Sequence, residues 1–160
     1  MKCMLPAAVY RGPHRVLSIK APWSYLICHR VKTIELRTRP LPKTVRDTVV
    51  LIHTSKVRDS GYTEIVYPDG IPPLSEDGRL PIPGKICAAV LFGNCIEYKD
   101  LRHFMRHASR HRCNEQAWLP GRKLYGWTID RVQWLTEQMT FRGMLGFPVY
   151  DGDVTLERVL

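Results

Sequence analysis

The feature that most constrains the fold is a set of strand-like segments that no regular series of helices separates. Residues 85–98 (KICAAVLFGNCIEY) carry the clearest strand pattern, and residues 48–56 have the nearly continuous apolar run of a central strand. The other predicted strands are residues 15–20, 32–39, 124–135 and the glycine-broken 139–150. Short helices are predicted at residues 21–30 and 100–112. This order argues against a doubly wound sheet and predicts a small mixed barrel of strands and short helices.

Length and composition fit one globular domain. The chain has 160 residues, of which 44% are hydrophobic and 24% are charged. We expect a loose N-terminal segment over residues 1–14, the domain over 15–150 and a C-terminal tail over 151–160. Residues 57–84 contain five prolines and four glycines. They predict a long loop excursion of the kind that serves as a lid or a binding loop.

The charge balance favours a polyanionic partner. Lysine and arginine number 24 against 15 acidic residues, which gives a net charge of +9 and a pI near 9.6. Such an excess raises the local concentration of nucleic acids or nucleotides. RNA or DNA, or a modified nucleoside, is therefore the expected partner.

Cysteine usage and hydropathy indicate a cytoplasmic protein. The five cysteines are odd in number, widely spaced and without a CxxC pair, which argues against a disulfide framework and a thiolate zinc site. No apolar run approaches the roughly 20 residues that span a bilayer. The motifs GxGxxG, GxxxxGK[ST] and GxSxG are also absent from the sequence, so no nucleotide cofactor is expected.

The segment HRVKTIELRTRP, residues 29–40, places four charges in a predicted strand. Glu35 and Arg37 lie two residues apart on one face, and Lys32 sits at the turn that leads into the strand. If that face lines a cleft, it offers a carboxylate for acid/base or amine-binding work and two cations for an anion. If the face meets bulk water, each ion pair contributes only about 0–1 kcal/mol.

Three further features are candidates for binding. The apolar strand 48–56 ends in His53, Thr54, Ser55 and Lys56, which brings polar groups to one rim of the sheet. Trp23 follows the strand that carries Lys20 and is a candidate for stacking on a base, whereas Trp134 is expected in the core. The predicted helix 100–112 carries histidines and arginines at helical spacing: His103, His107, His111, Arg102, Arg106 and Arg110. Without HExxH or a third ligand, this helix predicts a basic surface and no metal site.

The order of the motifs resembles a known family. VLSIKAPWSYLI, VKTIELRTRP, VVLIHTSK, GKICAAVLFG and YGWTIDRVQWL follow one another as in ASCH (activating signal cointegrator homology) domains, over roughly residues 15–150. The most specific piece is the family signature G-x-K-x-x-E-x-R, matched by Lys32, Glu35 and Arg37. Arg30 stands where the signature has glycine. The resemblance implies an α+β, mostly β fold: a PUA-like small β-barrel with short helices packed at the rim. It also implies a cleft between the barrel and the loop and helix region.

The resemblance also implies which residues line that cleft. They are Lys20, Trp23, Lys32, Glu35, Arg37, Ser55 and Lys56. Family members are proposed mainly as RNA- or DNA-binding modules, and some small members hydrolyse N4-acetylcytidine with a Lys and a Thr of the signature and a distal Glu. Glu35 occupies the position of that Thr, and Thr33 shares its face on strand alternation.

These observations lead to three hypotheses. The first is a nucleic-acid-binding protein, for RNA above all, whose cationic cleft holds a nucleotide or modified base. The second is a hydrolase acting on modified nucleosides or on RNA, with Lys32 and Glu35 as the catalytic pair. The third is a protein-interaction or regulatory module.

Overall fold

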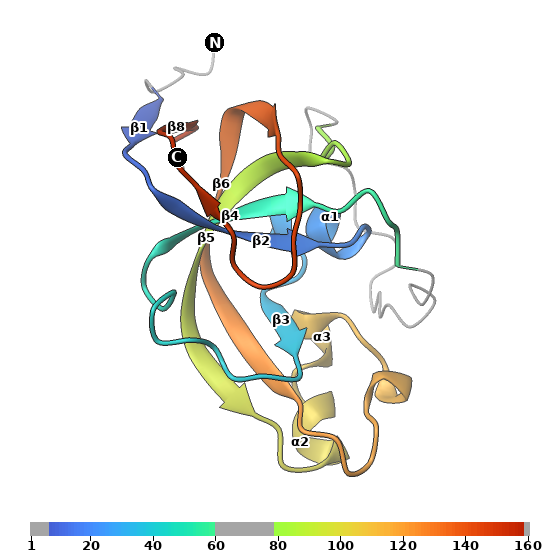
Figure 1. Ribbon diagram of the computed structural model, residues 1–160. Helices are drawn as coiled ribbons and strands as arrows, with labels where there is room; N and C mark the ends of the chain where they lie inside the picture. The colour runs from blue at the N-terminus through green and yellow to red at the C-terminus, as the bar shows by residue number, and fades with distance from the viewer. Residues whose placement is uncertain (1–6, 60–78, 159–160) are drawn as a thin grey trace.

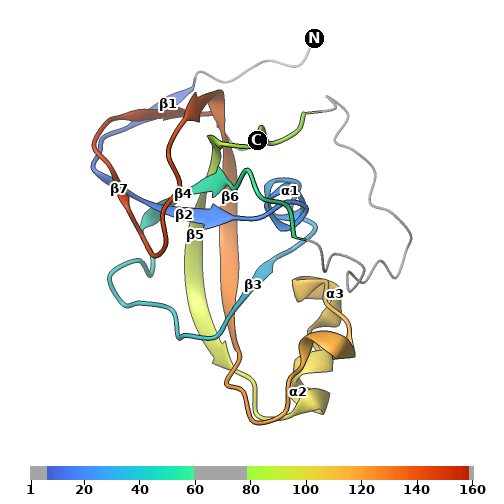
Figure 2. The same cartoon turned by 45° about the vertical axis from the view of Figure 1, so that its right-hand side comes forward.

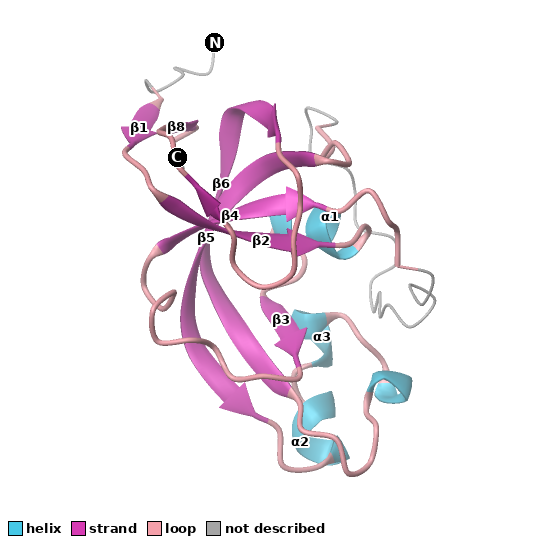
Figure 3. Cartoon of the chain, viewed as in Figure 1, coloured by secondary structure: helices cyan, strands magenta, loops and turns pink. Residues whose placement is uncertain are grey.

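The computed structural model describes residues 7–59 and 79–158. Within them, eight strands form one sheet in the order β1-β8-β6-β5-β4-β2-β7, with β3 also paired to β6 (Figures 1 and 3). The strands are β1 (Ala8–Tyr10), β2 (His14–Ile19), β3 (Ile34–Arg37), β4 (Val49–Thr54), β5 (Lys85–Glu97), β6 (Tyr125–Thr140), β7 (Val149–Tyr150) and β8 (Val154–Leu156). The α-helices are α1 (Trp23–Cys28), α2 (Leu101–Met105) and α3 (Ala108–His111), and a 3-10 turn covers Glu115–Ala117.

The long antiparallel pair β5–β6 joins two parts of the molecule (Figures 1 and 2). At one end it pairs with β4 and β8; at the other, β3 pairs with β6, and the connection between β5 and β6 carries α2 and α3. We call the first end, with β2 and β4, the barrel part, and the second the helical part. Register shifts at Ile86/Ala88, Leu91/Phe92 and Phe92/Cys95 interrupt the ladder. Such bulges add twist and bend to long strands, which lets one hairpin serve both parts.

Apolar side chains on both faces of the sheet build the core. β4 lies between β2, with which it runs parallel, and β5, and Val50, Leu51 and Ile52 are fully buried. Phe92 packs edge-on against Trp127, with ring centroids 5.5 Å apart. A separate cluster around Tyr98 and Phe104 fixes the helical part. This arrangement explains why the β4 segment reads as an almost uninterrupted apolar run.

The mostly β fold with short helices is confirmed, and several local expectations need correction. Within residues 7–59 and 79–158 the strand ladder is an open path whose end strands are β1 and β7. The predicted strand 139–150 is wrong over its middle: β6 runs on to Thr140, and only Val149–Tyr150 form a strand again. Most of the predicted excursion 57–84 lies outside the described residues.

The predicted helix 100–112 is two short helices. Asp100 caps α2 as expected, because its carboxylate accepts a hydrogen bond from the His103 N–H at 2.7 Å. The chain then breaks between Met105 and Ala108. The rings of His103, His107 and His111 nevertheless all lie around Tyr98, with ring centroids 5.1, 5.6 and 6.1 Å from that of Tyr98. None of the helices in the described part of the chain has the length and apolar character needed to cross a membrane.

The two predicted chain ends differ most from expectation. β1 lies in the segment taken as loose and β8 in the segment taken as a tail, and they pair antiparallel with Ala8 opposite Leu156. Leu156 is fully buried and Val154 nearly so. Strands of three residues are too short for alternation to reveal them.

Leu156→Ala tests whether the C-terminal strand belongs to the core. Removing a fully buried leucine leaves a cavity, so we expect the free energy of unfolding to fall by about 2–5 kcal/mol. Val9→Ala, on the paired strand and 64% exposed, is the control and should change stability little. Urea denaturation measures both; equal, small losses would show that β8 does not pack against the sheet.

Candidate functional site

A cleft of about 1370 Å³ opens between the barrel part and the helical part. Its lining comes from β2, β3 and β4, from the start of α1 and from the segments around residues 116–124 and 140–145. All seven residues that the resemblance assigned to a cleft line this one: Lys20, Trp23, Lys32, Glu35, Arg37, Ser55 and Lys56. The structure therefore brings together side chains that span residues 20–56 of the chain.

The turn before Lys32 explains the Arg30 position. After α1, Arg30 adopts a left-handed backbone conformation with φ of 61°, and the N–H groups of Val31 and Lys32 both donate to the Leu26 carbonyl. This is the usual end of a helix, where glycine is favoured because it lacks a Cβ. Arg30 takes the same conformation, and its guanidinium donates to the Val132 carbonyl at 3.0 Å. The departure from the signature thus leaves the turn intact.

Lys32 forms the buried floor of the cleft. Its side chain is 2% exposed, and Nζ donates to the His111 carbonyl at 2.8 Å and lies 3.8 Å from Glu35 Oε2. The ammonium also sits 5.1 Å from the centre of the Trp23 ring. Burial lowers the pKa of Lys32, and the nearby Glu35 carboxylate offsets part of that effect.

Glu35 joins Lys32 to Arg37. Its side chain is 8% exposed, and Oε1 accepts from Arg37 Nε at 3.0 Å while Oε2 faces Lys32. Arg37 reaches towards the Ser18 carbonyl at 3.5 Å and keeps 34% of its side chain exposed. The three charges therefore form one linked network, with Arg37 as its solvent-accessible end.

The stacking candidate Trp23 is held in place as a wall of the cleft. Its indole N–H donates to Asp59 Oδ2 at 2.7 Å, and Lys32 covers part of its ring. Trp134, expected in the core, is only half-buried and packs against that core, with Arg79 5.0 Å from its ring centre. Of the two tryptophans, Trp23 is the one that lines the cleft.

One histidine of residues 102–111 does not belong to the predicted basic surface. His111 is fully buried: its Nε2 bonds to the Phe104 carbonyl at 2.9 Å, and its Nδ1 accepts from the Cys113 N–H. The ring stacks on Phe104, and burial lowers its pKa to about 4. These two bonds hold the neutral ring in place. The backbone carbonyl of His111 accepts the hydrogen bond from Lys32.

The three arginines of this segment stay exposed but lie away from the cleft. Arg102, Arg106 and Arg110 are on the surface, and none is part of the cleft lining in the described residues. Arg110 Nε donates to Thr33 Oγ1 at 3.3 Å. Thr33 borders a separate cavity of about 270 Å³ with Arg30 and Asp130, so it does not share the cleft with Glu35. Within the described residues, no three His, Cys, Asp or Glu side chains are placed to hold a metal ion.

Ser18, Phe141 and Arg142 line the other wall and were not predicted to do so, whereas His53 was predicted as a polar group at the strand end. Ser18 Oγ and His53 Nδ1 are hydrogen-bonded at 2.9 Å, next to a bulge in the β4–β5 pairing at Ile52/His53. Burial lowers the pKa of His53, so this ring is neutral near pH 7. Phe141 and Arg142 also line this wall, in a segment that we had predicted as strand. Strand alternation placed Ser18 beside Val16 on one face of its strand and carried no signal for these contacts.

The lining is strongly cationic. It includes six basic side chains, Lys20, Lys32, Arg37, Lys56, Arg122 and Arg142, against the two acidic ones of Glu35 and Asp59. Because Glu35 is already paired with two cations, the remaining charge is available to an anion. Aromatic and apolar surface from Trp23, Phe141 and neighbouring leucines lies between these charges.

Solved structures with the same architecture share this frame. Crystal structures of ASCH from Zymomonas mobilis superpose on the chain: the protein itself has a TM-score of 0.56 at 14% identity, covering 84% of this chain and 85% of that chain. Two single-residue mutants of it give TM-scores of 0.53 and 0.54 at 11% and 12% identity, covering 84% of this chain and 86% and 88% of theirs. The chain has the ASCH fold. No protein-family model and no curated protein matches its sequence.

His111→Gln tests the buried neutral histidine. The unfolded chain binds a proton on this ring near pH 6.5, whereas the folded ring does so only near pH 4. The unfolded state therefore holds more protons between these values, and the free energy of unfolding falls as pH drops through the window, by about 3 kcal/mol in all. The variant, although less stable, should lose less stability between pH 7 and 4.5 in urea denaturation. An unchanged pH dependence would show that His111 titrates normally.

Proposed function

We propose that the chain binds nucleic acid and that its cleft holds a nucleotide of single-stranded RNA. The observation that carries this proposal is the cationic cleft around the buried Lys32–Glu35–Arg37 network, walled by Trp23. Basic clefts with aromatic walls suit unpaired strands, because phosphates meet the cations and bases meet the flat apolar faces. The burial of Lys32 and Glu35 argues against the alternative that these charges form a solvated strand face.

Each part of the site has a distinct task in this proposal. Arg37, the exposed end of the network, binds phosphate or base acceptors, and Lys20 and Lys56 at the rim add to the phosphate contacts. Trp23 walls the base. Glu35 holds Lys32 and Arg37 in position and, through a remaining lone pair, accepts from an exocyclic amine of the base. Arg102, Arg106 and Arg110, which are exposed outside the cleft, remain the predicted secondary surface that contacts the phosphate backbone of the RNA.

Salt dependence and one matched pair of variants test the binding. An eight-nucleotide single-stranded RNA that contacts about four cations should lose roughly 50-fold in affinity between 50 and 200 mM salt. Arg37→Gln should weaken binding about 10-fold or more, whereas Arg39→Gln, two residues on and exposed outside the cleft lining, should change it less than about 2-fold. Fluorescence anisotropy measures both.

The failures of this test are informative in different ways. No detectable binding at low ionic strength would refute a nucleic-acid function. Binding that survives both Lys32→Ala and Arg37→Ala would place it elsewhere and favour a protein-interaction or regulatory role for the cleft. DNA of the same length, run beside the RNA, separates a preference for RNA from binding to any single strand.

Hydrolysis of a modified nucleoside is the second candidate, and the environment of Lys32 favours it. Burial lowers the pKa of this amine, and Glu35 lies 3.8 Å away as a proton partner. An amine of this kind can take a proton from the water that attacks an acyl-amide. Thr33 lies outside the cleft lining, so the pair Lys32 and Glu35 would have to act without it.

Lys32→Met measures this second candidate directly. If Lys32 is the base, turnover of N4-acetylcytidine should fall at least about 100-fold, because methionine is unbranched and only one atom shorter than lysine but cannot take a proton. Thermal unfolding and Arg39→Gln serve as controls for stability and for charge. Equal turnover in wild type and Lys32→Met would remove Lys32 from any mechanism.

A further inference from the structure

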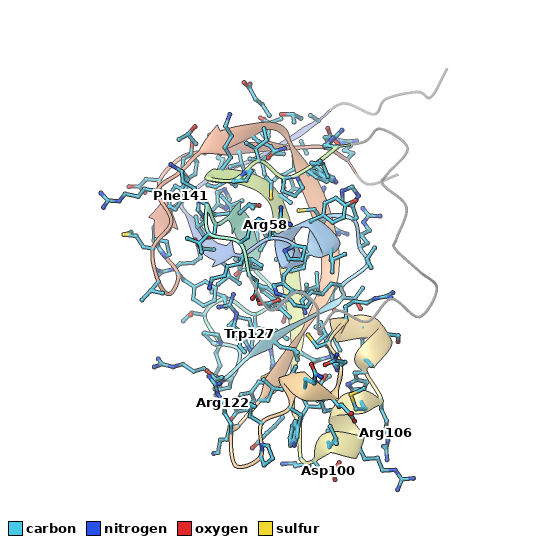
Figure 4. The ribbon with its side chains drawn as sticks, turned by 90° about the vertical axis from the view of Figure 1, so that its right-hand side faces the viewer. Arg58, Asp100, Arg106, Arg122, Trp127 and Phe141 are labelled. Atoms are coloured by element: carbon cyan, nitrogen blue, oxygen red, sulfur yellow. The ribbon has the colours of Figure 1, made fainter. Side chains whose placement is uncertain are left out.

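Two exposed segments lie at the mouth of the cleft and take no part in the Lys32–Glu35–Arg37 network at its floor. Residues 119–122 form one rim, on the helical part, and residues 141–145 form the other, beyond the end of β6. Both rims contribute to the lining of the same cleft. Figure 4 shows Phe141 on the barrel part and Arg122 on the helical part, towards the same side of the molecule.

The two rims repeat the same chemistry. Each one has an exposed leucine beside an exposed arginine: Leu119 is 49% exposed and lies near Arg122, and Leu145 is fully exposed and lies near Arg142. Met144, 58% exposed, adds to the second rim. Large apolar side chains held out at a concave mouth mark a contact surface more often than an isolated exposed leucine does.

The volume of the cleft calls for more than one nucleotide. Sites for drug-sized ligands measure about 300–1,000 Å³, and this cleft holds about 1370 Å³. One nucleotide on Arg37 and Trp23 would occupy the floor and leave both rims without a contact. A second and a third nucleotide would bring a base and a phosphate to each rim.

The side chains of the rims suit an unpaired nucleic-acid strand, which offers both flat rings and phosphates. A neutral partner lacks the anions, and an acidic partner without rings lacks the flat faces. A base offers an apolar face to leucine and methionine, and the adjoining phosphate offers an anion to arginine. In a duplex the faces of the bases are stacked and out of reach of such side chains. Charge complementarity over the whole lining, six basic against two acidic side chains, points the same way.

We propose that the two rims hold the nucleotides on either side of the one at the floor, so that a strand of about three nucleotides or more crosses the cleft from Arg122 to Arg142. This inference rests on the proposed function. It names the ligand as a single-stranded polynucleotide and assigns the free nucleoside a much weaker interaction. The rims then determine affinity for the strand, and Arg37 determines affinity for the nucleotide at the floor.

A length series with one matched pair of double variants tests the rims. The probes are uridine monophosphate and single-stranded oligouridylates of two, four and eight nucleotides, titrated at two salt concentrations. The wild type should bind the tetramer at least about 10-fold more tightly than the monophosphate, because two more phosphates find cations. Arg122→Gln with Arg142→Gln should erase most of that gain, leave the monophosphate within about 2-fold and reduce the salt slope by about 1.4.

The control removes the same charge from elsewhere on the surface. Arg39→Gln with Arg46→Gln lowers the net charge equally at exposed sites outside the cleft lining, and it should leave the length dependence intact. Leu145→Ser changes a fully exposed side chain, so it should leave folding unaffected, and it should weaken the tetramer about 3-fold or more without affecting the monophosphate. Oligodeoxythymidylate of the same lengths distinguishes RNA from DNA as the source of the strand.

Each outcome bears on a separate claim. If the monophosphate and the tetramer bind equally, or if the rim variant keeps the length dependence, the rim proposal is overturned and the floor stands. If polyglutamate of matched charge displaces the tetramer as well as RNA does, the rims select any polyanion and the proposal also falls. If no oligomer and no monophosphate binds, the proposed function itself fails.

Discussion

The buried ammonium of Lys32 is the interaction on which the cleft depends. A charge with 2% exposure is costly unless it is paired and hydrogen-bonded, and Lys32 meets this requirement with partners from three parts of the chain. Glu35 comes from β3, the His111 carbonyl from α3 and the Trp23 ring from α1. Removing any of these partners leaves a buried charge partly uncompensated, so the two parts of the molecule are held at one fixed spacing across the cleft.

In the same network, one cation stabilises the fold and another is available to a ligand. Glu35 compensates Lys32 at the floor and fixes Arg37 from the other side, while Arg37 keeps a third of its side chain exposed. His111 contributes because it stays neutral: a protonated ring would bring a second positive charge close to Lys32, and burial keeps its pKa at about 4. The result is a preorganised cation at the cleft surface whose orientation does not have to be fixed when a ligand binds.

The sequence predicted those parts of the site that depend on local strand alternation or on the order of motifs along the chain. Alternation located the central strands, and the order of motifs placed Lys32, Glu35 and Arg37 on one cleft, where the structure also has them. Alternation alone could not show that the polar face of β3 is an interior face, because that depends on α3 packing against it. It also placed Thr33 with Glu35, although Thr33 precedes β3 and turns to another cavity.

The features that the sequence missed share one physical cause. The His111–Lys32 contact and the β1–β8 pair join segments far apart in the chain, as does the cleft that Arg122 and Arg142 line together with β3. Periodicity reports only local geometry. The histidine spacing could not show that His111 is buried, because that depends on its contacts with Phe104 and Lys32, while Arg102 and Arg106 stay exposed. Fold-level likeness to ASCH of Zymomonas mobilis supplies the frame, and the site has to be argued from its own residues.

The central claim is that single-stranded RNA enters the cleft and meets the buried network. The most direct measurement is a side-chain NMR titration with an eight-nucleotide RNA, following the Arg37 Nε–H and the Trp23 indole N–H. The account predicts saturable shifts of both signals at one common dissociation constant, larger than any shift of the α2 amides from Leu101–Met105. Shifts confined to α2 and α3, with Arg37 and Trp23 unmoved, would contradict it.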